Sequence, residues 1–570
     1  MSNRSQPSLR RLLTVGAVPL AVAGMSVATG SANATAAAGV TFTVNSTGDA
    51  PDSGKNGQCK TAANVCTLRA AIMESNWTSQ PVTINFNIPG SGVQTINVAS
   101  RLPNVTAPGG LTINGYSQPG ASANTSSLVS NAQIKVEIRG RGPMSFDGLV
   151  YSTKNNVVKG LALYDFHNQI FFSGLNADNN KVLGSYICTN AAGTVSSPAS
   201  EGQIGILLQK GASSNVIGTP SAADRNVVSG CGNRGITMSF SPTSYNVIQN
   251  NIVGLNPSGT RPLRNGSQGV DINYTDFNLV GGDNPGQGNV LSGNGGSGIE
   301  DSHGGKNHDN TITGNLIGTT PSGEVASWAG NLLWGIRFEG PKFCGTAGHS
   351  NPGGCTLADV PEGLPNHNTA RNNVIVSNVK GGVLIDKGHN NVTLSGNWIG
   401  ANKAGADGGN GVAGVQIQRG SFGMNITGNV IAHNPVGVQI SSTGGFPPGD
   451  EQRTYGNTIS RNSTFDNTGI KFVWKTSPTL VQNAMAAPAL SAASGKVIKG
   501  TTCSGCKVEL FVGENKTAKS GKTYLASVTA STSGAFSIKL SAATGSPITA
   551  TSTDKSGNTS PFQVPVTLKG

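Results

Sequence analysis

The hydrophobic positions between residues 205 and 472 follow one short repeating pattern: a glycine, an aliphatic residue, a variable residue and an apolar residue. The nine copies begin at Gly205, Gly235, Gly269, Gly298, Gly335, Gly382, Gly414, Gly437 and Gly469. Copies recur roughly every 23 to 47 residues, a spacing typical of stacked repeats. Within a copy, apolar and variable positions alternate, which predicts a strand with one buried face. Stacked coils of such strands bury a continuous aliphatic core, so the pattern predicts a parallel β-helix.

A second pattern, asparagine, any residue and an aliphatic residue, lies between the glycine copies. It occurs at Asn226, Asn246, Asn289, Asn310 and Asn425. Each coil is therefore expected to carry two or three short strands, separated by Gly and Asn, which tolerate left-handed turns. The 80 glycines, 12% charged residues and 5% aromatic residues fit a turn-rich β protein with a thin aliphatic core.

A helix is predicted once, at residues 66–76, where Leu68, Ala71, Ile72 and Ser75 share one face. It would cover the open apolar end of the first coil. The segment Cys66-Thr67-Leu68-Arg69-Ala70-Ala71-Ile72 resembles the opening signature of secreted bacterial right-handed parallel β-helix repeat proteins of the pectin-lyase-like superfamily, although Ala70 stands where glutamate is usual. Residues 102–106, 113–120, 225–230 and 314–318 resemble other stretches of that group, so the resemblance covers roughly residues 40–475. It implies architecture and secretion, while lyases, hydrolases, epimerases and proteins without known activity share the fold.

The repeat patterns stop near Pro478, and strand-like runs separated by turn residues follow at 507–512, 524–529, 535–540 and 548–553. Residues 550–560 resemble the last strand and turn of bacterial Ig-like domains, which implies a spacer or a surface binder; we expect a structural spacer. The chain is therefore expected to be all-β, with a signal peptide at 1–34, a cap and first coils at 35–130, the β-helix at 131–477 and an Ig-like β-sandwich at 478–570.

The first 34 residues have the features of an export signal: Arg4, Arg10 and Arg11 precede an apolar stretch, and Ala32-Asn33-Ala34 offers a cleavage site. Sec export and twin-arginine export both stay open. No later stretch is apolar enough for a membrane span, so a secreted, extracellular protein is expected, at most loosely held at the cell surface. Eight cysteines fit this location, and near pairing predicts Cys59 with Cys66, Cys188 with Cys231, Cys344 with Cys355, and Cys503 with Cys506.

Stacking the copies aligns their variable positions on adjacent coils about 4.8 Å apart. The ionisable residues concentrate in the middle coils, where Asp271, Glu300, Arg337, Glu339 and Asp386 are predicted to form one outward-facing patch. Neighbouring carboxylates suit glycoside chemistry, which needs an acid and a base or nucleophile about 5–9.5 Å apart. Asp271 and Glu300 are the predicted acid/base pair, Glu339 and Asp386 support them, and Arg337 would bind a substrate uronate. The alternative is a surface ion-pair ladder without catalytic use.

Substrate contacts are predicted at His303, Tyr274, Trp328 and Trp334, which lie near the patch in sequence. An irregular insertion at 340–368 would form one wall of a cleft. The histidines, His389 among them, show no metal-ligand spacing and are interpreted as surface residues. No cofactor and no metal are expected, and a structural calcium ion stays compatible with the sequence.

The formal net charge is +12, and without the signal segment 36 basic residues face 27 acidic ones. Such a balance favours acidic partners. We therefore expect a monomer that hydrolyses, cleaves by β-elimination or simply binds an extracellular polysaccharide or cell-wall polymer, an anionic one above all. No nucleic-acid partner is expected. The alternative is a non-catalytic structural or adhesion protein.

Overall fold

The computed structural model describes residues 39–198, 202–302, 307–340, 366–443 and 453–570. Residues 39–570 belong to one compact unit, which begins at Gly39. The predicted signal segment lies outside the described residues. All that follows concerns this unit.

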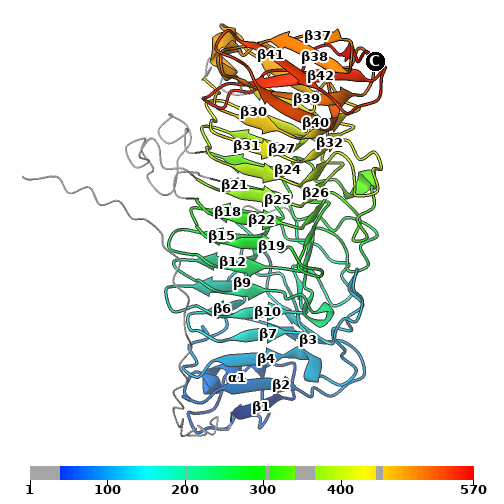
Figure 1. Ribbon diagram of the computed structural model, residues 1–570. Helices are drawn as coiled ribbons and strands as arrows, with labels where there is room; N and C mark the ends of the chain where they lie inside the picture. Colours follow the sequence, from blue (N-terminus) through cyan, green and yellow to red (C-terminus); the bar gives the residue numbers. More distant parts are fainter. Residues whose placement is uncertain (1–38, 199–201, 303–306, 341–365, 444–452) are drawn as a thin grey trace, which may run out of the picture. The chain divides into compact units, whose positions relative to one another are not determined.

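The described residues up to 473 form three parallel sheets, confirming the predicted all-β parallel β-helix (Figure 1). Sheet A contains β1 (Val40–Val44), β2 (Val82–Phe86), β4 (Leu111–Asn114), β7 (Val157–Lys159), β10 (Lys181–Leu183), β13 (Val216–Ile217), β16 (Val247–Ile248), β19 (Leu279–Gly281), β22 (Thr311–Thr313), β25 (Thr369–Arg371), β28 (Thr393–Ser395), β31 (Asn425–Thr427) and β34 (Thr458–Ser460). Sheet B contains β3 (Gln94–Asn97), β5 (Val136–Arg139), β8 (Ala162–Tyr164), β11 (Tyr186–Ile187), β14 (Val227–Val228), β17 (Ile252–Val253), β20 (Val290–Leu291), β23 (Leu316–Ile317), β26 (Val374–Ile375), β29 (Trp398–Ile399), β32 (Val430–Ala432) and β35 (Ser463–Phe465). Sheet C contains β6 (Leu149–Tyr151), β9 (Asn168–Ser173), β12 (Ile204–Gln209), β15 (Arg234–Ser239), β18 (Val270–Asn273), β21 (Ile299–Ser302), β24 (Trp334–Glu339), β27 (Gly381–Asp386), β30 (Val415–Gln418), β33 (Val438–Ser441) and β36 (Ile470–Val473).

From β4 onward the chain visits sheets A, B and C in turn, so each of these coils adds one short strand to each sheet, whereas β1 adds to sheet A alone and β2 and β3 add to sheets A and B. The repeating glycine lies at the turn into sheet C, and close packing between coils explains it. A Cβ atom on Gly235 would lie 2.6 Å from the carbonyl oxygen of Gly269, and one on Gly269 would lie 2.7 Å from that of Gly298. Any larger residue would separate the coils at this corner.

Three columns of stacked asparagines, here called the asparagine ladders, line the corners of the coils. In the ladder at the turn from sheet A to sheet B, each side-chain amide donates to the next one, as in Asn251 to Asn289 at 2.9 Å and Asn289 to Asn315 at 2.9 Å. These side chains are buried, and each accepts a backbone N–H as well. Four of the five Asn-x-aliphatic residues, Asn226, Asn246, Asn289 and Asn310, are ladder members, whereas Asn425 is exposed in β31. None of the five adopts the left-handed backbone that the sequence suggested.

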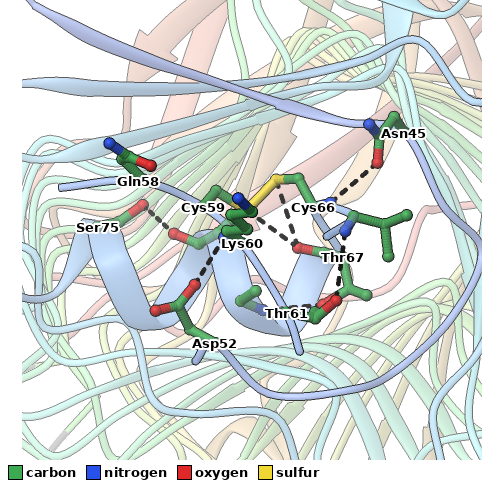
Figure 2. The surroundings of a disulfide bond; sticks show 12 residues. Asn45, Asp52, Gln58, Cys59, Lys60, Thr61, Cys66, Thr67 and Ser75 are labelled. Atoms are coloured by element: carbon green, nitrogen blue, oxygen red, sulfur yellow. Dashed lines mark hydrogen bonds between the residues drawn. A yellow bond between two sulfur atoms is a disulfide. The ribbon is translucent and has the colours of Figure 1, made fainter. Parts of the chain in front are cut away.

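The predicted helix is confirmed as α1 (Leu68–Ser75), capped by the Thr67 hydroxyl, which accepts from the Ala70 N–H at 3.1 Å. Leu68 and Ile72 join the core of the first coils. A disulfide between Cys59 and Cys66 holds the preceding segment beside the helix, where the Cys66 N–H donates to the Asn45 side chain at 2.9 Å (Figure 2). The other turns of helix are short 3-10 segments: η1 (Gly115–Ser117), η2 (Ala222–Asp224), η3 (Ser327–Ala329), η5 (Pro478–Leu480) and η6 (Gln482–Ala484).

Two further predicted disulfides are confirmed. Cys188 and Cys231 join neighbouring coils with Cα atoms 4.9 Å apart, and Cys503 pairs with Cys506. The predicted Cys344–Cys355 pair lies outside the described residues.

The C-terminal residues form two antiparallel sheets, β37-β38-β41 and β40-β39-β42-β43, which confirms the small Ig-like sandwich. The strands are β37 (Ala489–Ala493), β38 (Val497–Thr501), β39 (Lys507–Gly513), β40 (Gly521–Thr529), β41 (Ala535–Lys539), β42 (Pro547–Thr553) and β43 (Val566–Thr567). Phe511 and Phe562 of this module belong to the same core cluster as Ile470 of the last coil. The buried Glu509 accepts from the Ser460 hydroxyl at 2.7 Å. The module therefore closes the apolar end of the solenoid, a role beyond that of a spacer.

Candidate functional site

The predicted patch exists as a column of neighbours on the outer face of sheet C. Asp271 pairs with Glu300, Glu300 pairs with Arg337, and Glu339 pairs with Asp386 in the strand register. We call these five residues the charged stripe. The alignment deduced from the repeat is thus confirmed, and residues more than 100 positions apart share one surface.

The stripe differs from the prediction in its exposure. The outward positions were expected to face solvent, but Asp271 and Asp386 are 1% exposed and Glu300 is 6% exposed. Arg337 and Glu339 are partly exposed. Outward direction on a β-helix does not ensure contact with water, because neighbouring long side chains lie over the strand.

The Asp271 carboxylate lies close to one cation and one hydroxyl group. One carboxylate oxygen is 3.4 Å from Nε of Arg234, and the other accepts from the Ser302 hydroxyl at 3.4 Å. Burial raises the pKa of Asp271 to about 6, with the nearby Glu300 carboxylate acting in the same direction and Arg234 opposing. A carboxyl group with this pKa exchanges its proton near neutral pH.

Glu300 has two direct side-chain partners. Its carboxylate accepts from Nε2 of Gln268 at 2.8 Å and lies 3.4 Å from the Arg337 guanidinium. Arg337 also contacts the Glu339 carboxylate at 2.7 Å. Arg337 therefore stands between two acids, as predicted, and it is engaged by both of them.

Asp386 is enclosed by a second cationic group. Nε of Arg419 donates to its carboxylate at 2.8 Å, and Lys387 beside it contacts Glu339. Burial, together with the positive charges of Arg337 and Arg419, lowers the pKa of Lys387 to about 8. A lysine in this range can lose its proton at mildly alkaline pH.

Two buried ionisable residues lie on the inner side of the same coils. Asp301 pairs with Ile272 and Phe338 at the inward, apolar position, and its carboxylate accepts from Nδ2 of Asn307 at 3.0 Å. Burial raises the pKa of Asp301 well above its usual range. His389 is also in the interior, so its interpretation as a surface histidine is wrong; burial lowers its pKa to about 3.

The predicted substrate contacts lie in different places. Tyr274 directly follows β18 at the end of the Asp271 strand, and Trp334 begins β24 on the Arg337 strand, with its ring over Gly381. Trp328 lies in η3, in the connection from sheet B to sheet C. His303 and most of the 340–368 insertion lie outside the described residues.

Residues that the repeat pattern did not indicate complete the site. Arg234 and Gln268 precede the glycine pattern in their coils, and Lys387 and Arg419 directly follow sheet C strands. Their signal in the sequence is a charged or amide residue flanking the same strand in successive copies. Among the described residues, a cavity of about 410 Å³ is found elsewhere, outside sheet B, between Lys135, Tyr186 and Arg261.

Comparison with known proteins defines the two parts of the chain. Residues 484–568 match the bacterial Ig domain family (Big_6), and residues 342–487 match the family described as periplasmic copper-binding protein (NosD). The chain thus combines a parallel β-helix with a C-terminal part that matches the bacterial Ig domain family. No group of His, Cys, Asp and Glu that could hold a metal ion occurs in the described residues. Nor does any described helix have the length and apolar character needed to cross a membrane.

Among solved structures, the A-module of mannuronan C-5 epimerase AlgE4 from Azotobacter vinelandii is 14% identical, covering 72% of this chain and 93% of its own, with a TM-score of 0.43. The periplasmic alginate epimerase AlgG is 12% identical over 70% of this chain and 76% of its own, with a TM-score of 0.34. The bacteriophage CBA120 tailspike protein 2 is 8% identical over 88% and 73%, with a TM-score of 0.27. A comparison with curated proteins finds no match.

Proposed function

We propose that this protein acts on an extracellular anionic polysaccharide at the charged stripe. The observation that carries the proposal is the pair formed by Asp271 and Glu300. The two acids are register neighbours, Asp271 titrates near neutral pH, and Glu300 is paired with Arg337. Two carboxyl groups in such different environments suit the separate roles of proton donor and base or nucleophile.

In this proposal Asp271 donates a proton to the oxygen that leaves the scissile glycosidic bond. Glu300 is the second carboxylate, acting as the base or nucleophile. Arg337 and Arg234, on either side of the pair, supply positive charge for an acidic sugar. The same groups serve β-elimination from a uronate, where cations stabilise the developing charge and Lys387 or a carboxylate removes the proton. The chemical nature of the products distinguishes hydrolysis from β-elimination.

The test is a screen of the secreted protein against polygalacturonate, alginate and neutral polysaccharides. Reducing ends with an ultraviolet-absorbing unsaturated sugar indicate elimination, and reducing ends without it indicate hydrolysis. Asp271→Asn and Glu300→Gln should each lower kcat by at least about 100-fold, since general acid–base groups contribute on that scale. The control is Gln416→Ala, which changes the same column one coil beyond the charged stripe. Unchanged activity in the two acid variants would remove the assignment.

The second candidate function is a non-catalytic secreted scaffold, and one observation favours it. Each acid of the stripe contacts a cation, as in Asp386 with Arg419 and Glu339 with Lys387, so the stripe is also a complete ion-pair network. A scaffold predicts that Asp271→Asn alters stability alone, with no polymer cleaved by any variant. The screen separates the two functions.

A further inference from the structure

The turn from sheet C to sheet A repeats two left-handed backbone positions in successive coils. One directly follows the sheet C strand, and the other lies two residues before the sheet A strand. The first position is occupied by Gly174, Lys210, Phe240, Tyr274, Lys387 and Arg419. The second is occupied by Asn155, Asn179, Ser214, Tyr245, Phe277, Asp309, His367, Asn391, Gly423 and Gly456.

Aromatic residues at these positions need an explanation, because a bulky side chain is disfavoured at positive φ. Most coils use Gly, Asn, Ser or Asp at the second position, as the backbone prefers. Two consecutive coils instead use aromatic residues at both positions: Phe240 and Tyr245 in one, Tyr274 and Phe277 in the next, with φ between 55° and 62°. We call these four residues the aromatic ledge. Strained residues of this kind concentrate at functional sites.

The rings of the aromatic ledge are arranged as two flat pairs. Phe240 and Tyr274 stack with centroids 6.3 Å apart and planes 7° apart, and Tyr245 and Phe277 stack at 5.1 Å and 6°. His308 packs edge-on against Phe277 at 5.2 Å. Tyr245 stays 58% exposed, Phe240 43% and Phe277 41%. Large exposed apolar side chains gathered in one place mark an interaction surface.

The aromatic ledge adjoins the charged stripe through the backbone of β18. Tyr274 follows Asn273, and Asn273 is the register neighbour of Ser302, whose hydroxyl donates to Asp271. The ledge therefore occupies the coil of Asp271 and the coil before it, beside the predicted acid pair. Asp276 and Asp309 next to His308 give this edge polar groups as well.

We propose that the aromatic ledge is a sugar-binding subsite that holds pyranose rings of the polysaccharide on the side of Asp271 away from Arg337. This inference rests on the proposed function and specifies where its polymer runs: along the stack of coils. The C–H face of a pyranose is flat and apolar, and aromatic rings offer a matching face with little conformational entropy to lose. Coil spacing of about 4.8 Å lets one chain contact both the ledge and the acids.

The chain itself supplies the substitutions for the test. Tyr245→Asn/Phe277→Asn installs the residue that equivalent coils use at this position, so folding is preserved or improved. Trp474→Ala, at another exposed aromatic residue, is the matched control. The probes are polygalacturonate and alginate in affinity gels, together with kinetics on a polymer and on a short oligosaccharide made from it. Thermal unfolding confirms that each variant folds.

Loss of the ledge should weaken polymer binding by about tenfold or more and raise KM for the polymer, with kcat on the short oligosaccharide unchanged. The Trp474→Ala control should bind as the unaltered protein does. Equal polymer affinity in the double variant and the unaltered protein would overturn the ledge while leaving the acid pair intact. Failure of the unaltered protein to bind any of the anionic polymers would overturn both the ledge and the proposed function.

Discussion

The asparagine ladders and the charged stripe are both stacks of polar side chains produced by the same coil-to-coil register, and three of the five stripe residues are buried like the ladders. They differ in how their hydrogen bonds are satisfied. Along a ladder each amide is donor to one neighbour and acceptor from the other, as at Asn251, Asn289 and Asn315. The stripe mixes charges: the acids Asp271 and Glu300 are register neighbours, and Arg337 contacts both Glu300 and Glu339.

This difference distinguishes the ladders, which stabilise the fold, from the charged stripe, which is the candidate functional site. A neutral ladder can be extended coil after coil without cost, and the one at the turn from sheet A to sheet B continues from Asn226 to Asn462. A buried ion network costs desolvation for every charge, and replacing such networks by apolar residues is often stabilising. The stripe occupies four consecutive coils; uncharged Gln416 and Gln439 continue the column of Arg337, and Lys471 ends it. The carboxylates are concentrated in these four coils, which is why the stripe is the candidate site.

The largest effect is expected from breaking a ladder. Asn289→Ala leaves the N–H and side-chain amide of Asn251 and the carbonyl of Ile248 without their partner. Buried unpaired groups cost about 1–3 kcal/mol each, so the free energy of unfolding should fall by about 3 kcal/mol or more. Denaturant unfolding measures it. Asn425→Ala, at an exposed asparagine, should change stability by less than about 0.5 kcal/mol. A small loss of stability in Asn289→Ala would show that water molecules replace the hydrogen bonds of the removed side chain.

The second prediction concerns the cost of a charge in the stripe. Burial raises the pKa of Asp271 from 3.8 to about 6, so the folded state holds this proton more tightly than the unfolded chain does. Stability is therefore lost as the pH rises through about 4 to 6. Asp271→Asn should raise the free energy of unfolding by up to about 3 kcal/mol above about pH 7 and by nothing near pH 3, while abolishing activity.

Asp283 provides a control, because its pKa is shifted in the opposite direction from that of Asp271. Hydrogen bonds from Arg371 and Thr313 lower its pKa to about 2. Its stabilising contribution is present above the unfolded pKa of 3.8 and is lost as the pH falls toward 2. Because Asp283 is exposed to solvent, Asp283→Asn should cost only about 0.5 kcal/mol at neutral pH. Equal behaviour of the two variants would contradict the distinction between a buried functional acid and a surface ion pair.

Much of this comparison can be read from the sequence, and the rest depends on three-dimensional packing. The glycine pattern predicted the register that brings Asp271, Glu300 and Arg337 together, because each coil repeats the same corner. Burial of the stripe could not be predicted, since it depends on side chains such as Arg234 and Gln268 from outside the pattern. The inward direction of Asp301 was hidden as well, because an acid occupies the apolar position of its copy. The ladders were visible as a pattern, but only the contacts between coils explain them.

The third prediction tests whether Arg337 acts through its positive charge or through the shape of its guanidinium group. Arg337→Met removes the partner of Glu300 and Glu339 and should lower the free energy of unfolding by about 2 kcal/mol, since two partly buried acids lose their counter-charge. Arg337→Lys keeps the charge and should recover about half of this loss. If Arg337 also binds the uronate, KM should rise in both variants, because lysine cannot reproduce the two-pronged geometry of arginine. Recovery of KM by lysine would contradict that role.

The smallest effect is expected at Gln416, which lies in the same column one coil beyond the charged stripe. Gln416 is the register neighbour of Leu384 and Gln439, and its amide donates to Gln418 at 2.6 Å on a partly exposed face. Gln416→Ala should change the free energy of unfolding by less than about 0.5 kcal/mol, and activity on the polymer should be unchanged. Gln416→Glu should have an equally small effect on activity, because residue 416 lies on a partly exposed face one coil beyond the charged stripe. A marked loss of activity in either variant would extend the site beyond the four charged coils, and the contrast between a local charged stripe and the uncharged glutamines that follow it would no longer hold.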